Sequence, residues 1–153
     1  MLRILIATFL VVAAPLRAEQ VGKGGVDWVG NDIVIEALAD PDIPGVTCHI
    51  AYFDRSMIDR LSQGNWFEDP SNASIACRQT GPIDRASLSE IDQSEAGEEL
   101  FRQRRSAVLK TLLVKRIYDE ANATLIYLAH AAELSEGSAK MAISTVPLYR
   151  IED

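Results

Sequence analysis

The segment that decides the fold is VKRIYDEANATLIY, residues 114–127. Both of its ends are rich in β-branched and aromatic residues, which favour strands. Between them, Asp119–Asn122 is typical of a four-residue hairpin loop. A helix is the alternative, because the wider stretch 98–134 also contains apolar residues that would suit one, namely Leu100, Val108 and Leu112. The residue pattern alone favours the hairpin and the helix about equally.

Upstream of this segment, short apolar runs alternate with turn residues. β-branched residues predict strands at Ile33–Leu38, Val46–Phe53 and Ser74–Gln79. The first two flank ADPDIPG, residues 39–45, whose prolines, glycine and aspartates predict a turn. We also expect a short helix within residues 54–65, a turn or short helix in the acidic stretch 84–99, and a glycine-rich lead-in at 20–30 anchored by Trp28.

The first 18 residues have the three-part layout of a secretory signal peptide. One positive charge at Arg3 precedes an apolar run of 11 residues, Ile4–Ala14, and a proline then ends any helix. This run is too short to span a bilayer, which requires about 20 residues. We therefore expect export by the general secretory (Sec) route, cleavage after Ala18, and one periplasmic domain over residues 19–153. Neither cysteine lies near the cut, which excludes a lipoprotein anchor, and no later stretch predicts a membrane span.

The charge balance excludes one broad class of partner. The chain has 15 basic and 22 acidic side chains, a formal net charge of −7. Removal of the leader takes away Arg3 and Arg17 and leaves −9. A nucleic-acid binder needs a basic surface, so DNA and RNA are not expected as partners. With 48% hydrophobic and 24% charged residues, the chain has the composition of a folded globular domain.

The sequence contains two cysteines, Cys48 and Cys77. An exported protein folds where thiols are oxidised, and two cysteines allow one internal pairing, so we predict a Cys48–Cys77 disulfide. A redox-active pair usually has Cys-x-x-Cys spacing and an electropositive setting, and neither is present. The predicted role of the pair is therefore structural.

Basic residues cluster in one part of the chain. One interpretation is a basic face that binds a small anionic ligand or an acidic envelope protein. Arg102 and Arg104 would lie on one side of a strand and form the smallest pair of side chains able to bind a carboxylate or phosphate. The other interpretation, which we favour, is local neutralisation by the acidic stretch 84–99 that precedes them. The six residues of this basic run are Arg102, Arg104, Arg105, Lys110, Lys115 and Arg116.

The remaining chemistry-bearing residues have structural interpretations. Asp40 and Asp42 could supply oxygen ligands to a hard cation, but a turn role is favoured. His49 and His130 lie in apolar strand-like runs, where a structural histidine is the default. The sequence contains no Gly-x-Ser-x-Gly, no glycine-rich phosphate loop and no His-Glu-x-x-His. We therefore predict no catalytic residue, no metal and no cofactor.

Three stretches resemble signatures of the CreA family (catabolite regulation protein A), in the family's order. They are VIEALADPDIPGVTC (34–48), ASIACRQTGPI (73–83) and EGSAKMAISTVP (136–147). In the last, which we expect to form a loop, Ala139 stands where the family usually has proline and Met141 where it usually has a polar residue. The resemblance implies a small exported protein and favours the hairpin. The expected fold is a mainly β or β-rich α+β domain, an antiparallel sandwich or barrel-like, with one or two short helices.

Three classes of function fit the sequence. The first, which we favour, is a non-enzymatic periplasmic binding or interaction module of this family, linked to envelope or metabolic signalling. The second is an enzyme, such as a hydrolase, whose carboxylates are scattered in sequence and converge in the fold. The third is a structural or stress-protective envelope protein.

Overall fold

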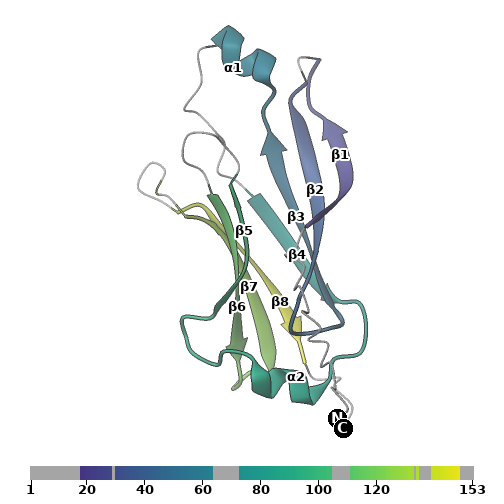
Figure 1. Cartoon of the computed structure of the whole chain (residues 1–153), viewed down its shortest axis with the longest axis vertical. Coiled ribbons are helices and arrows are strands. Elements are labelled where there is room, and N and C mark those ends of the chain that lie inside the picture. Colours follow the sequence, from purple (N-terminus) through teal and green to yellow (C-terminus); the bar gives the residue numbers. More distant parts are fainter. Residues whose placement is uncertain are drawn as a thin grey trace, which may run out of the picture.

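Two four-stranded antiparallel sheets make up most of the molecule (Figure 1). The computed structural model describes residues 18–28, 30–63, 73–104, 111–132, 134 and 139–148. The N-terminal sheet contains, in order, β1 (Glu19–Gly25), β2 (Asp32–Ala39), β3 (Val46–Asp54) and β4 (Ala73–Gln79). The C-terminal sheet contains β5 (Glu98–Arg104), β6 (Thr111–Asp119), β7 (Thr124–Ala131) and β8 (Met141–Pro147). Two short helices, α1 (Met57–Gln63) and α2 (Arg85–Glu90), follow β3 and β4.

The segment 114–127 forms a hairpin, so the predicted β fold is confirmed and the helical alternative is wrong. β6 pairs antiparallel with β7 from Leu112 opposite Ala131 to Asp119 opposite Thr124. In the loop, the Asp119 carboxylate accepts hydrogen bonds from the backbone N–H and the side-chain amide of Asn122 (3.1 and 2.7 Å). Aspartate and asparagine thus stabilise this turn by local hydrogen bonds.

Two strands lie where the sequence predicts none. The glycine-rich lead-in forms β1, which pairs with β2 and has an irregular register between Gln20 and Gly22. Trp28, predicted to be an anchor, is 95% exposed. β8 occupies the stretch that we expected to be a loop, because its Ile143, Thr145 and Val146 are good strand formers and pair with β7.

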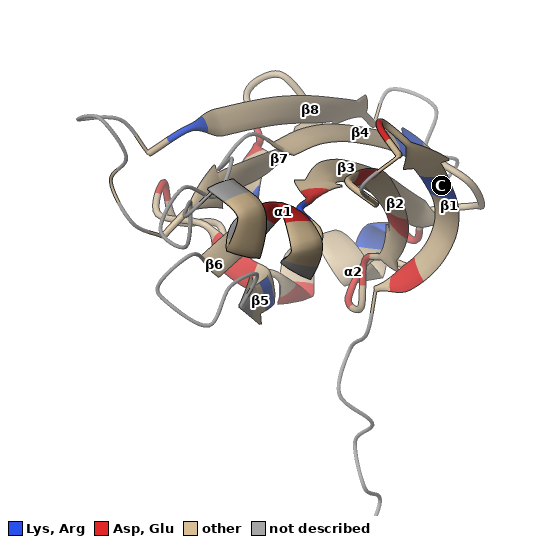
Figure 2. Cartoon of the chain, turned by 90° about the horizontal axis from the view of Figure 1, so that it is seen from above, with Lys and Arg blue, Asp and Glu red and all other residues tan. Residues whose placement is uncertain are grey.

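The core lies between the two sheets. Alternate side chains of β3 and β7 point inward, and Ile50, Leu125 and Tyr127 are fully buried. The sheets approach each other along β4 and β8, which lie side by side in Figure 2. There the backbone N–H of Cys77 donates a hydrogen bond to Oγ of Ser144 (2.8 Å). This side of the sandwich is therefore held by a polar contact between the sheets as well as by the core.

Cys48 and Cys77 form a disulfide across β3 and β4. They are direct partners in the strand register, and their sulfur atoms are 2.05 Å apart. Cys48 is 2% exposed and belongs to the core. The bond therefore links two of the signature stretches, 34–48 and 73–83, within the N-terminal sheet.

Candidate functional site

The side chain of Arg116 is the centre of a buried polar cluster between the sheets. Arg116 is 1% exposed, although its place in the basic run predicts a surface residue. It points into the sandwich because strand residues alternate, and its neighbours Lys115 and Ile117 take the opposite face of β6. This member of the basic run is therefore not part of an exposed anion-binding face.

The turn after β2 supplies most of the partners of Arg116. Nη1 of Arg116 donates to Oδ1 of Asp40, and Nη2 donates to Oδ2 of Asp42 (3.1 Å) and Oε2 of Glu98 (2.6 Å). The other oxygen of Asp40 accepts a hydrogen bond from the Tyr127 hydroxyl (2.6 Å). Asp40 also accepts two backbone N–H groups of its own turn (both 3.0 Å). The buried carboxylate is thus hydrogen-bonded through both oxygens.

Burial and ion pairing shift the pKa of Arg116 in opposite directions. Loss of solvent lowers the pKa of Arg116, but the charge of Asp40 and the hydrogen bonds to the carboxylates outweigh it, so the pKa is raised overall. The pKa of Tyr127 is also raised, first by burial and then by the negative charge of Asp40. Arg116 therefore stays charged and Tyr127 stays neutral. The cluster holds an ion pair and a neutral donor, which suits a structural link better than proton transfer.

Asp40 and Asp42 thus act in a turn, and a close approach at Gly45 fixes that turn. The Gly45 carbonyl accepts the backbone N–H groups of Thr80 and Gly81 (2.7 and 3.1 Å). Gly45 has φ +100°, and a Cβ on it would lie 2.3 Å from the Pro82 carbonyl oxygen. A side chain does not fit there, so glycine allows the first two signature stretches to meet.

Two other described members of the basic run contact the acidic stretch 84–99. Arg102 donates two hydrogen bonds of 2.8 Å to Glu99, and this pairing lowers the pKa of Glu99. Nζ of Lys115 lies 3.4 Å from the carbonyl oxygen of Ala96. The side chain of Arg104, and all of Arg105 and Lys110, lie outside the described residues. Among the residues described, these contacts resemble local neutralisation more than an open basic face.

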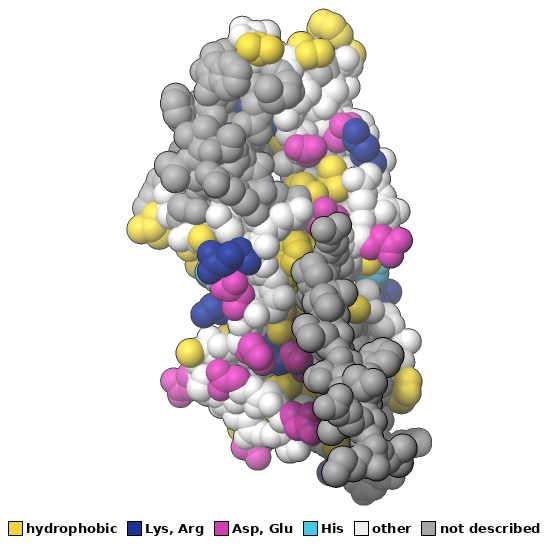
Figure 3. All heavy atoms as spheres, viewed as in Figure 1, with side chains coloured by type: hydrophobic (Ala, Val, Ile, Leu, Met, Phe, Trp, Pro, Cys, Tyr) yellow, Lys and Arg dark blue, Asp and Glu magenta, His cyan; other side chains and the backbone are white. Residues whose placement is uncertain are grey.

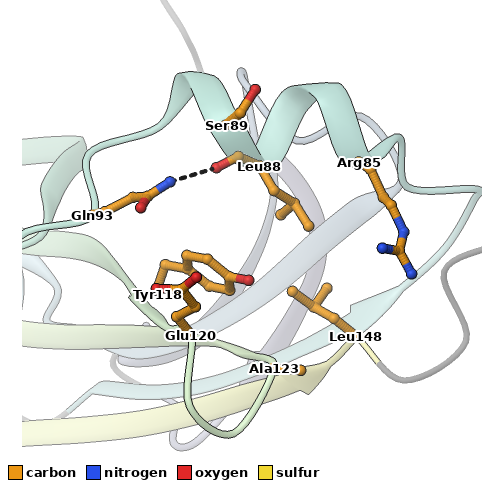
Figure 4. A pocket seen from close by; sticks show the side chains of 8 residues that line it. All are labelled: Arg85, Leu88, Ser89, Gln93, Tyr118, Glu120, Ala123 and Leu148. Atoms are coloured by element: carbon orange, nitrogen blue, oxygen red, sulfur yellow. Dashed lines mark hydrogen bonds between the residues drawn. The ribbon is translucent and has the colours of Figure 1, made fainter.

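A pocket of about 310 Å³ lies beneath α2, close to the Arg116 cluster. Tyr118, which follows Arg116 on the same face of β6, lines it. Three segments far apart in the sequence form the walls: α2, the β6–β7 hairpin and the residue after β8. Their main contributions are Arg85 and Leu88, then Tyr118, Glu120 and Ala123, and finally Leu148 (Figure 4).

The pocket has an apolar middle between two charges of opposite sign. In Figure 4, Leu88 and Leu148 point toward each other, and the ring of Tyr118 lies beside them. Arg85 extends from α2 on one side of this apolar group, whereas Glu120 lies on the other. Leu148 is buried, Leu88 and Tyr118 are half-buried, and both charged residues are exposed. This arrangement can hold a small amphipathic molecule.

Hydrogen bonds fix the walls of the pocket. The Asp84 side chain caps α2 by accepting the backbone N–H two residues further on (2.9 Å). At the other end of α2, the Gln93 amide lies 3.4 Å from the carbonyl oxygen of Leu88 (Figure 4). The backbone N–H of Leu148 donates to the Ala123 carbonyl (2.8 Å), which ties the chain after β8 to the hairpin loop. The pocket is therefore formed by segments that are bonded to their neighbours.

Sequence reasoning missed this pocket. Arg85 gave one signal, since it is the single basic residue of the acidic stretch 84–99. Tyr118 and Glu120 did not indicate a pocket, because a tyrosine in a strand and a glutamate in a hairpin loop are ordinary residues of a hairpin. The walls come together only when the two sheets pack. The spacing of residues in the sequence does not predict which distant segments meet in this way.

The histidines form no site in the described structure. His49 and His130 are half-buried in β3 and β7, and Nδ1 of His130 lies 2.9 Å from the carbonyl oxygen of Ala131. Across the described ranges, no group of three or more His, Cys, Asp and Glu residues could hold a metal ion. In that same part of the chain, none of the helices has the length and apolar character needed to cross a membrane.

Comparison with known proteins gives a consistent match along most of the chain. A family model described as CreA protein matches residues 21–151. Protein CreA of Escherichia coli (strain K12) is 38% identical in an alignment 153 residues long. The alignment covers 95% of this chain and 94% of the relative. Protein CreA of Escherichia coli O157:H7 gives the same values. No solved structure matches the chain.

Proposed function

This chain belongs to the CreA family, as its three signature stretches predict, and from its fold we propose that it is an exported protein that binds a small ligand. The observation that carries the proposal is the pocket beneath α2. Ligand sites are usually concave and combine apolar walls with a few convergent polar groups. About half of this pocket's lining is apolar, from Leu88, Leu148 and the Tyr118 ring, and the polar half includes Arg85 and Glu120. Its volume of about 310 Å³ lies at the small end of the usual range, about 300–1,000 Å³.

The surroundings of the pocket support binding without large rearrangement. Tyr118 belongs to the same strand as Arg116, whose ion pair with Asp40 ties the C-terminal sheet to the turn after β2. A site held in this way loses little conformational freedom when a ligand enters, which favours affinity.

The carboxylates that converge around Arg116 give no support for catalysis at the pocket. The fold does bring together acids that are scattered in sequence, namely Asp40, Asp42 and Glu98. All three, however, accept hydrogen bonds from Arg116, and Asp40 is buried. A general acid or base needs to reach a substrate, and none of the three lines the pocket.

Export is the second part of the proposal. It is supported by the signal-peptide layout of residues 1–18, and the family match begins after that stretch, at residue 21. The Cys48–Cys77 bond supports it further, because structural disulfides persist in oxidising compartments. We therefore propose a periplasmic binding protein linked to envelope or metabolic signalling.

Native mass spectrometry of the purified protein, followed by a thermal-shift screen of small metabolites, tests the binding role. We expect a retained molecule or a raised melting temperature with at least one compound. Leu88→Trp places a large side chain in the pocket and should abolish this effect. Ala86→Trp adds the same bulk to an exposed position of α2 that does not line the pocket, so it should leave the effect unchanged. An effect that survives Leu88→Trp would contradict binding in this pocket.

A further inference from the structure

We propose that the ligand of this pocket is a zwitterion, with a carboxylate and an ammonium group at opposite ends of a short apolar body. This inference rests on the proposed function, since it concerns the same pocket. A dipeptide with apolar side chains is the simplest molecule of this class.

The two charged walls match the two ends of such a molecule. The planar guanidinium of Arg85 can hold a carboxylate with two parallel hydrogen bonds. The carboxylate of Glu120 can accept hydrogen bonds from an ammonium group. Because Arg85 and Glu120 lie on different sides of the apolar group in Figure 4, one ligand meets both only if its own charges are separated.

The charge around the pocket argues against a simple anion. Acidic side chains gather on the lower part of the face in Figure 3, where α2 lies. Glu90, Asp92 and Glu95, on α2 and the loop after it, are exposed and negative. Such a field repels an anion before it reaches Arg85, whereas Arg85 itself disfavours a ligand that is only cationic. A zwitterion satisfies both conditions.

The apolar middle of the pocket accounts for the body of the ligand. Leu88, Leu148 and the Tyr118 ring form a surface suited to an aliphatic side chain. Exposed ion pairs contribute little free energy, so this apolar contact supplies most of the affinity. The charges at Arg85 and Glu120 then determine which ligands are selected. From the usual strength of exposed pairs, each charge should change the affinity by about fivefold.

Four related probes separate these contributions: leucyl-leucine, its N-acetyl derivative, its C-terminal amide, and the form blocked at both ends. Calorimetric titration of the purified, disulfide-bonded protein should give the tightest binding for leucyl-leucine. Blocking either end should weaken binding by about fivefold, and blocking both ends should weaken it further.

Substitutions then assign each preference to one side chain. Arg85→Gln should remove the preference for a free carboxylate and retain the preference for a free ammonium group. Glu120→Gln should do the reverse. Arg102→Gln and Asp54→Asn remove the same two kinds of charge at exposed positions outside the pocket and should leave both preferences intact.

The outcomes distinguish this inference from the proposed function. If all four probes bind equally well and Leu88→Trp abolishes their binding, the pocket binds ligands but recognition of a zwitterion is wrong. If none of the probes binds, the inference is also wrong, and the native mass spectrum alone decides whether the pocket holds another ligand. If binding survives Leu88→Trp, both the inference and the proposed pocket fail.

Discussion

A charged side chain can belong to the core when its partners are buried with it, and Arg116 is such a residue. Its guanidinium is 1% exposed and donates to three carboxylates, of which Asp40 is itself buried. Burying an ion pair costs desolvation free energy, so the intact pair does not necessarily add stability. Removing one partner is different, because the remaining charge then lacks both water and a counter-ion.

We therefore expect Arg116→Met to lower the free energy of unfolding by about 3–5 kcal/mol, the usual loss when a buried ion pair is broken. Arg102→Met is the matched control, since the Arg102–Glu99 pair is largely exposed and should contribute about 0–1 kcal/mol. Urea unfolding of both variants measures the two values. Equal losses would contradict a special role for the buried pair.

For single residues, the sequence predicts the local role of a side chain better than it predicts which distant residues that side chain contacts. Asp40 and Asp42 were predicted to lie in a turn, and they do. Nothing in the sequence pairs Asp40 with Arg116, which lies 76 positions away, because that contact depends on how the two sheets pack. For the same reason, the sequence does not show that one member of the basic run, Arg116, points inward.

Among the elements, the turn between β2 and β3 contacts two segments that lie far from it in the sequence. Its carboxylates contact β6, and its Gly45 carbonyl accepts backbone N–H groups of the segment after β4. Gly45 cannot be replaced without strain, since its φ of +100° disfavours L side chains and the space for a Cβ is occupied.

Gly45→Ala should accordingly cost more than about 1 kcal/mol of unfolding free energy. Gly24→Ala is the control, because a Cβ at Gly24 in β1 meets nothing within 4 Å. Alanine is less costly than glycine in a strand, so this second variant should be neutral or more stable by about 0.5 kcal/mol. Thermal unfolding followed by circular dichroism compares them. A Gly45→Ala protein as stable as the parent would show that the turn tolerates a side chain.

The elements also show why some strands were predictable and others were not. β2, β3 and β4 are marked by β-branched residues between turns. β6 and β7 carry apolar residues on both faces: in β7, Leu125 and Tyr127 are buried while Ile126 and Leu128 are half-buried. Their alternation is therefore weak, and the family resemblance was needed to choose strands over a helix. β1 was missed because a glycine-rich segment forms a strand only through its pairing with β2.

Across the residues that the structure describes, polar contacts between the two halves of the sandwich add to the apolar core. The ion pair of Asp40 and Arg116 joins the turn after β2 to β6. The Cys77–Ser144 hydrogen bond joins β4 to β8. The disulfide does not cross between the sheets, but it fixes Cys77, the residue that donates this hydrogen bond. Its loss should therefore affect the packing of the two sheets as well as the N-terminal sheet.

Replacing both cysteines, by Cys48→Ala and Cys77→Ala together, tests this arrangement without leaving a free thiol. We expect the unfolding free energy to fall by about 2–5 kcal/mol, as is usual for a native disulfide. The fold should persist, since buried residues of both sheets form an extensive core that does not depend on the bond alone. Circular dichroism should therefore retain its β signal while the melting temperature falls. Thiol titration of the parent protein, unfolded but not reduced, should find none. Two free thiols, or an unchanged melting temperature in the double variant, would contradict a stabilising disulfide and weaken the case for an oxidising compartment.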